Sequence, residues 1–211
     1  MKQILCFGDS NTWGLVPGKQ ERYQWGIRWT SLLQEKINDK DIRIIEEGLC
    51  GRTTVFEDNR NRVGRKAIDL LPVILESHSP LDFAIIMLGA NDCKSFVRAS
   101  ALEIGKGLSL CIDVLKTKIP AQRILVISPL VLGDDVWRPE KDPDFDIESI
   151  KVSRQLKEVF RAISDMQGTF FMAASDIAKA SKVDDEHFDE IGHKKFAEAV
   201  YEKLLELKVV D

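Results

Sequence analysis

The chain has 211 residues, of which 44% are hydrophobic and 30% are charged, and its 30 basic and 34 acidic side chains give a formal net charge of −4. This composition is typical of a globular protein with a sizeable core, and we expect one domain over residues 1–211. A mildly acidic chain does not favour binding to nucleic acid, which needs clustered basic surface. No stretch approaches the roughly 20 apolar residues that a membrane helix needs.

Five short runs predict β-strands along the chain. They are residues 3–7, 41–47, 82–88, 123–128 and 168–173. The run at 82–88 is almost wholly apolar, as expected for a strand buried on both faces. The run at 168–173 is the weakest of the five.

Apolar residues at helical spacing lie between and after these strands. They cover residues 29–37, 67–75, 102–115, 150–163 and 196–205. Ser100 and Glu103 form a capping-box pattern at the start of the third of these helices. Alternation of strands and helices predicts an α/β fold, a three-layer α/β/α sandwich around a five-stranded parallel sheet. The acidic stretch 131–146 contains proline and is predicted to be a long loop over one rim of that sheet.

Polar residues follow three of the predicted strands. Asp9 and Ser10 come after the first strand, Gly48 to Thr53 after the second, and Asn91 with Asp92 after the third. Ligands of open α/β sheets bind beyond the carboxyl ends of the strands, so these loops are expected to meet at one rim. Ser10 by itself fits a helix cap equally well.

A serine hydroxyl needs a base before it becomes a nucleophile, and the chain offers three histidines. His78 is predicted at a helix end or turn, and His193 on a solvent-facing position of the last helix. His187 lies in a loop that can return to the rim, and Asp184 stands three residues before it. A carboxylate at that spacing can accept a bond from Nδ1 and leave Nε2 free for the Ser10 proton. On spacing alone, Asp185, Glu186 and Asp189 compete with Asp184 for this position.

Four blocks, GDSNTWG, GLCGRT, GAND and DDEH, resemble in order those of the SGNH, or GDSL-like, hydrolase family. The chain is most similar to the small bacterial arylesterase/acyltransferase branch, through ILCFGDSxTWG, RW, IIEEGLxxRTT and IIMLGxND. The resemblance implies a flavodoxin-like SGNH hydrolase fold and a serine esterase. It assigns the nucleophile to Ser10, the base to His187 and its orienting carboxylate to Asp184. It also implies an oxyanion hole formed by the backbone N–H groups of Ser10 and Gly51 and the side-chain amide of Asn91.

Two residues depart from the family pattern. The second block often has Asn two residues before its first glycine, where this chain has Glu46. The similar branch also has Glu there. The last block often has Gly after its Asp, where this chain has Asp185, and an extra negative charge beside the base is expected to raise the pKa of His187 slightly.

The resemblance implies a short-chain ester, such as an acetate, as substrate, with acyl transfer to alcohols as a further activity. The residues predicted to line the substrate site are Asp9, Trp13, Lys94, Phe96 and Trp137. For Trp13, packing in the core is the alternative. A carbohydrate O-acetylesterase is the second hypothesis for function, and a non-catalytic ligand-binding relative is the third. Oligomers in the similar branch narrow the site, and a homo-oligomer is expected here.

Neither a signal peptide nor a CxxC pair is visible in the sequence. We therefore expect a cytoplasmic protein with reduced thiols. A disulfide between Cys6 and Cys50 is the alternative. No metal-ligand spacing occurs, and no glycine-rich phosphate motif follows a strand. The sequence therefore predicts no cofactor and no metal, and partners limited to a small ester substrate and further copies of the chain, without nucleic acid or membrane.

Overall fold

The computed structural model describes residues 1–60 and 62–211. Its five strands are β1 (Lys2–Gly8), β2 (Ile42–Gly48), β3 (Phe83–Met87), β4 (Ile124–Ser128) and β5 (Phe170–Ala173). They form one parallel sheet in the order β2-β1-β3-β4-β5. The predicted parallel sheet is confirmed, and the weak fifth strand is two residues shorter at its start than expected.

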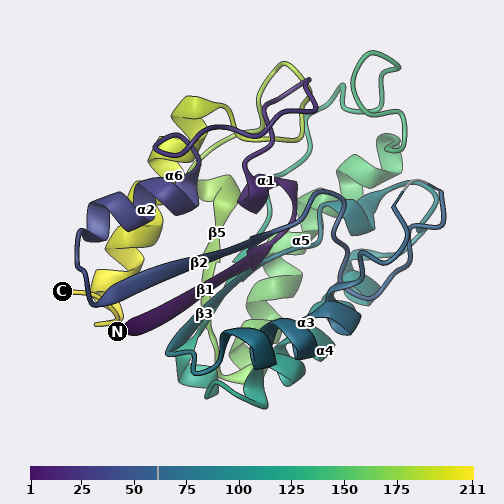
Figure 1. Ribbon diagram of the computed structural model, residues 1–211. Helices are drawn as coiled ribbons and strands as arrows, with labels where there is room; N and C mark the ends of the chain where they lie inside the picture. The colour runs from purple at the N-terminus through teal and green to yellow at the C-terminus, as the bar shows by residue number, and fades with distance from the viewer. Residues whose placement is uncertain (61) are drawn as a thin grey trace.

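Six α-helices lie between and after the strands (Figure 1). They are α1 (Ser10–Trp13), α2 (Trp29–Ile37), α3 (Ala67–His78), α4 (Ala101–Lys116), α5 (Ile147–Gln167) and α6 (Glu190–Glu206). Three single turns of 3-10 helix complete the described elements: η1 (Asn91–Cys93), η2 (Ala121–Arg123) and η3 (Ala174–Asp176). The Ser100–Glu103 capping box begins α4 as predicted, and Asp146 with Ser149 forms a second one at α5. Because such caps satisfy the first free N–H groups, they fix where each helix begins.

Helices cover both faces of the sheet and make three layers. On one face, α3, α4 and α5 pack against alternate strand residues such as Leu5, Phe7 and Ile86. On the other face, α2 and α6 pack against the intervening residues, including Ile4, Cys6 and Ile85. Successive strand side chains point to opposite faces, so an entirely apolar strand feeds two separate cores. The predicted α/β/α sandwich is confirmed.

The adjacent strands β2, β1 and β3 end at the same level. Gly8, the last residue of β1, pairs with Gly48 of β2 and with Met87 of β3. The loops that follow these strands therefore start side by side at one edge of the sheet. Helix α1 packs so closely against β2 that a Cβ on Gly48 would lie 2.1 Å from the backbone nitrogen of Trp13. A glycine at position 48 thus permits α1 to sit directly on the strand ends.

Candidate active site

Ser10 is the first residue of α1 and lies immediately beyond the end of β1. Asp9, not Ser10, caps this short helix, because its Oδ1 accepts a hydrogen bond from the Asn11 N–H at 3.0 Å. The Ser10 N–H stands at the helix start, where backbone N–H groups have no helical acceptor. Ser10 is only 4% exposed. The alternative that Ser10 serves as the helix cap is therefore wrong.

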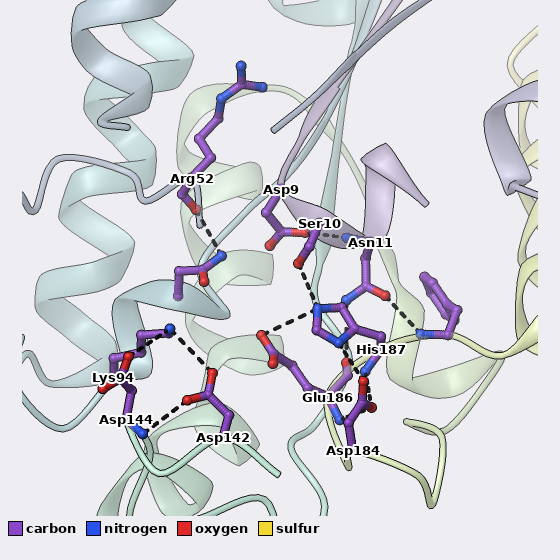
Figure 2. Close-up of polar contacts among 12 residues, drawn as sticks. Asp9, Ser10, Asn11, Arg52, Lys94, Asp142, Asp144, Asp184, Glu186 and His187 are labelled. Atoms are coloured by element: carbon purple, nitrogen blue, oxygen red, sulfur yellow. Dashed lines mark hydrogen bonds and ion pairs between the residues drawn. The ribbon is translucent and has the colours of Figure 1, made fainter. Parts of the chain in front are cut away.

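His187 and Asp184 lie in the loop between η3 and α6, and this loop returns to Ser10 (Figure 2). His187 Nε2 lies 2.8 Å from Ser10 Oγ, and His187 Nδ1 lies 2.8 Å from Asp184 Oδ2. The other Asp184 oxygen accepts the backbone N–H groups of Glu186 and His187, both at 3.1 Å. The carboxylate thus holds both the loop backbone and the ring. With Nδ1 donating to Asp184, Nε2 is the nitrogen that can accept the hydroxyl proton.

Asn11 joins the helix of Ser10 to the loop of His187. Its Oδ1 accepts the Phe188 N–H at 2.9 Å, and its Nδ2 donates to the Glu186 carbonyl oxygen at 3.4 Å. Both residues next to His187 are therefore tied to the residue next to Ser10. Sequence reasoning missed this role, and the one available signal was an amide side chain directly after the predicted nucleophile.

Asn91 and Gly51 lie on the loops after β3 and β2. Asn91 Nδ2 donates to the Arg52 carbonyl oxygen at 3.1 Å, which leaves its second amide hydrogen available. Gly51 has a φ of +77°, and a Cβ there would lie 2.5 Å from the Arg62 side chain. A glycine is thus required for the conformation of this loop.

Arg52 connects the three loops, a role that the sequence did not reveal. Its buried guanidinium donates to the carbonyl oxygen of Gly8 at 2.8 Å and to that of Glu47. Because its own carbonyl holds Asn91, one residue fixes the ends of β1 and β2 and the amide after β3. Loss of the guanidinium would therefore release the ends of β1 and β2, whereas the carbonyl that holds Asn91 belongs to the backbone and would remain.

Two carboxylates control the charge of His187. Burial would lower the pKa of the imidazole, but the nearby Glu186 charge, together with Asp184, raises it to about 9. Glu186 Oε1 lies 3.7 Å from Nε2, on the side of the ring opposite Asp184 (Figure 2). Burial tends to raise the pKa of Asp184, yet its bonds with His187 hold it below the ordinary value. A base with this pKa binds its proton tightly at neutral pH.

The prediction that Asp185 raises the pKa of the base is wrong, because that carboxylate points elsewhere. Asp185 forms an ion pair with Lys141 at 2.6 Å and approaches Lys182 at 3.5 Å. The residue has a positive φ of 58°, and its carboxylate also accepts the Asp135 N–H at 3.2 Å. The next residue along, Glu186, supplies the charge instead.

The other two histidines lie outside this arrangement. The prediction that His193 faces solvent is wrong: the residue is fully buried, and its Nδ1 accepts the Trp29 N–H at 3.2 Å. Burial lowers the pKa of His193 to about 3, so the ring is a neutral packing element between α6 and α2. His78 is the last residue of α3, as predicted, and its Nε2 lies 2.9 Å from Glu47 Oε1.

Two of the five predicted substrate-lining residues, Asp9 and Lys94, bear charges near the site. Asp9 directly precedes Ser10, and Lys94 acts on Glu186. Asp9 is 1% exposed, and burial raises its pKa to about 7. Lys94 Nζ forms ion pairs with Asp142 at 3.3 Å and Asp144 at 3.4 Å, and its charge also acts on Glu186. These residues shape the electrostatic field of the site, while their contact with substrate stays a prediction.

The three predicted aromatic residues make contacts outside the Ser10–His187–Asp184 chain. Trp13 is half-buried beneath the Arg22 guanidinium, and Phe96 lies beneath that of Arg60. Trp137 is 39% exposed in the loop that follows β4, and its indole N–H donates to the Asp134 carbonyl oxygen. The roles of these three rings toward substrate stay predictions.

Glu46, which departs from the family pattern, holds the start of α2 against the sheet. Both of its oxygens accept from Arg28, at 2.7 and 2.8 Å, and one also accepts from Thr30. Burial tends to raise the pKa of this carboxyl, but Arg28 and Thr30 lower it below the ordinary value. Glu46 therefore has a structural function at this position.

Residues 1–60 and 62–211 contain all four cysteines of the chain. All four cysteines are unpaired, so Cys6 and Cys50 do not form a disulfide. In this part of the chain, no three His, Cys, Asp or Glu side chains gather as metal ligands would. None of its helices combines the length and the apolar character needed to cross a membrane.

The fold and the site together define a class. A parallel α/β sheet carries, at its carboxyl edge, a serine hydrogen-bonded to a histidine and through it to a carboxylate, which is the geometry of serine hydrolases. Residues 6–195 match the GDSL-like Lipase/Acylhydrolase family. The chain belongs to this family of hydrolases, as its sequence blocks predict.

Several solved structures resemble the chain over nearly its whole length. Est24, a carbohydrate acetylesterase from Sinorhizobium meliloti, is 32% identical with a TM-score of 0.88, over 98% of this chain and 100% of that one. An inhibitor-bound aryl esterase from M. smegmatis is also 32% identical, with a TM-score of 0.90 over the same shares. A carbohydrate acetylesterase family member from Sinorhizobium meliloti is 26% identical, with a TM-score of 0.88 over 100% of both chains. No functionally curated protein matched in sequence.

Proposed function

We propose that the protein is a serine esterase that removes short acyl groups, such as acetyl, from small esters. The observation that carries this proposal is the chain of two 2.8 Å contacts from Ser10 through His187 to Asp184. In the first half-reaction His187 takes the hydroxyl proton as Ser10 attacks the ester carbonyl. The proton then passes to the departing alcohol, and an acyl-enzyme remains.

The negative charge of the tetrahedral intermediate falls on the former carbonyl oxygen. We assign its stabilisation to the N–H groups of Ser10 and Gly51 and the amide of Asn91. Such donors are worth about 3–4 kcal/mol each when they are held in place before the reaction. The support for this assignment is the Arg52 carbonyl, which fixes Asn91, and the left-handed turn at Gly51.

The preference for short acyl groups follows from burial. Ser10 and Asn91 are each 4% exposed and His187 is 5% exposed. An acetyl group demands little room between them, whereas each further methylene of an acyl chain has to displace packed side chains. Esterase activity on acetate should therefore exceed that on longer acyl groups.

A carbohydrate O-acetylesterase is the second candidate. It is supported by the two Sinorhizobium structures described by that activity, by Glu186 beside the base, and by Lys94, whose charge acts on Glu186. Carboxylates and ammonium groups form the hydrogen bonds that sugar hydroxyls require. The two candidates share the chemistry at Ser10 and differ only in the leaving alcohol.

The test is an acyl-chain-length series of p-nitrophenyl esters, run beside acetylated xylose. We expect turnover of the acetate to be fastest, and Ser10→Ala to abolish turnover of every ester while the fold is kept. Ser109→Ala is the matched control, since that serine lies on α4 with its hydroxyl bonded to Gln167. Full activity in Ser10→Ala would show that Ser10 is not the nucleophile, whereas no ester turnover together with no phosphonate labelling of Ser10 would indicate a non-catalytic protein.

A further inference from the structure

Glu186 is a buried carboxylate on the reacting side of the base. It is 6% exposed, and its Oε1 lies 3.7 Å from the His187 nitrogen that also contacts Ser10 Oγ. Figure 2 shows its side chain reaching from the loop toward that nitrogen, whereas Asp184 lies at the other nitrogen of the ring. The carboxyl group of Glu186 therefore borders the space in which bonds form and break.

The backbone of Glu186 is fixed on both sides. Its N–H donates to Asp184, and its carbonyl oxygen accepts from Asn11. The positive charge of Lys94 acts on the carboxyl group, but no hydrogen bond to its oxygens is present among the described residues. The imidazole of His187, 3.7 Å away, balances the charge of the carboxylate, but its oxygens keep the capacity to accept hydrogen bonds. They are therefore available to a molecule that binds beside the base.

The second half-reaction supplies such a molecule. After the alcohol leaves, a nucleophile takes its place about 2.8 Å from Nε2. Glu186 Oε1 is 3.7 Å from Nε2, and this spacing allows one oxygen to lie about 2.8 Å from both atoms. One nucleophile can therefore contact both His187 and Glu186. A water molecule donates one hydrogen to His187 and the other to Glu186. A monohydric alcohol has only one hydrogen and presents carbon to the carboxylate.

We propose, building on the proposed esterase function, that Glu186 selects the acyl acceptor by accepting a second hydrogen bond from it. Water and vicinal diols satisfy both His187 and Glu186, and simple alcohols do not. The carboxyl group retains an acceptor oxygen in either protonation state. Glu186 thus favours hydrolysis over transfer to monohydric alcohols.

The step is balanced as follows. The acceptor oxygen bonds to the acyl carbon, its proton passes to His187 Nε2, and the bond between that carbon and Ser10 Oγ breaks. The same proton then returns to Ser10 Oγ and restores the free enzyme. The hydrogen held by Glu186 stays with the product, and no electrons are exchanged with any further reagent.

The experiment measures how one acetyl-enzyme divides between acceptors. Full-length protein is given p-nitrophenyl acetate in water with 1-propanol or 1,2-propanediol at equal concentration, and acetate and acetate esters are quantified. Both acceptors need the same neutral base, so the product ratio does not depend on the ionisation of His187. Loss of a hydrogen bond to a charged group changes such a ratio roughly tenfold.

In Glu186→Leu we expect the ratio of propyl acetate to acetate to rise roughly tenfold and the preference for the diol over 1-propanol to be lost. Asp185→Asn is the matched control, because the neighbouring carboxylate binds Lys141 and should leave the ratio unchanged. An unchanged ratio in Glu186→Leu, or an equal change in the control, would overturn the proposal.

The initial burst of p-nitrophenol counts competent sites in every variant. If Glu186→Leu gives no burst, the product ratio is measured in Glu186→Asp, whose shorter side chain is drawn back from the acceptor. A raised ratio then supports the proposal, and an unchanged ratio overturns it. A failure of the esterase proposal is recognised separately, since the wild-type protein would then release no p-nitrophenol and form no acetyl-enzyme.

Discussion

Replacing Glu186 by glutamine tests the charge that surrounds the base. The value of kcat/KM depends on the fraction of free enzyme in which His187 is neutral. With the pKa of His187 at about 9, wild-type activity should fall about tenfold for each pH unit below that value. Glutamine has nearly the same shape as glutamate and removes only the negative charge.

The size of the effect follows from the geometry. Two unit charges 3.7 Å apart interact by about 1 kcal/mol in water and by about 4 kcal/mol at the effective dielectric constant of partly buried sites. One pKa unit corresponds to about 1.4 kcal/mol. Glu186→Gln should therefore lower the pKa of His187 by about 1 to 3 and move the acid limb of the activity profile to lower pH.

The assay is kcat/KM for p-nitrophenyl acetate across the pH range, corrected for spontaneous hydrolysis. Glu186→Gln should be more active than wild type in mild acid, and Asp185→Asn should follow the wild-type curve because its carboxylate is held by Lys141. If the Glu186→Gln and wild-type limbs coincided, Glu186 would not control the charge of the base, and the electrostatic reasoning would be refuted.

The same proton also links pH to stability. The folded state holds the pKa of His187 at about 9 against an ordinary value of 6.5, so the protonated ring stabilises the fold. This contribution, about 3 kcal/mol, is complete below pH 6.5 and is lost as pH rises through 9. Between those values activity should rise while the free energy of unfolding in urea falls, and the fall should be smaller in Glu186→Gln.

Three substitutions test other parts of the site and its support. Asn91→Ala should lower kcat for p-nitrophenyl acetate about 10²- to 10³-fold with little change in KM, and an unchanged kcat would contradict its oxyanion role. Gly51→Ala should lower both the melting temperature and kcat, since φ is +77° and the new methyl would meet the Arg62 side chain; wild-type values for both would contradict the requirement for glycine. Arg28→Met should reduce the free energy of unfolding in urea by about 2 kcal/mol, because Glu46 loses the two charged hydrogen bonds from Arg28. An unchanged free energy of unfolding would show that Arg22 alone suffices as a partner of Glu46.

The layers of the fold were predictable because hydrophobic periodicity encodes them directly. The run around β3 is apolar on both faces, and the helices repeat their apolar residues along one stripe. Prediction was weakest where burial is partial. Three of the four residues of β5 are only half-buried, and this strand at the edge of the sheet is shorter than its apolar run suggests.

The residues of the Ser10–His187–Asp184 chain were also predictable, because their order and spacing form recognisable blocks. The residues that hold this chain in place were not predictable from the sequence. Arg52 acts through a guanidinium that reaches two carbonyl oxygens brought close only by the sheet register. The polar character of His193 predicts an exposed position on α6, but the residue lies in the interior beside Trp29. Charge patterns predict exposure well, but they do not identify a polar side chain that fills a defined interior position.

Asn11 has a consequence for how the chain acquires activity. Its partner Phe188 lies 177 positions further along, and Ser10 and His187 are separated by the same distance. During synthesis from the amino terminus, the first strand and its polar loop must wait for almost the entire polypeptide to emerge before these contacts exist. Ester hydrolysis should therefore be absent from nascent or prematurely terminated chains, so that turnover reports completion of the fold as a whole.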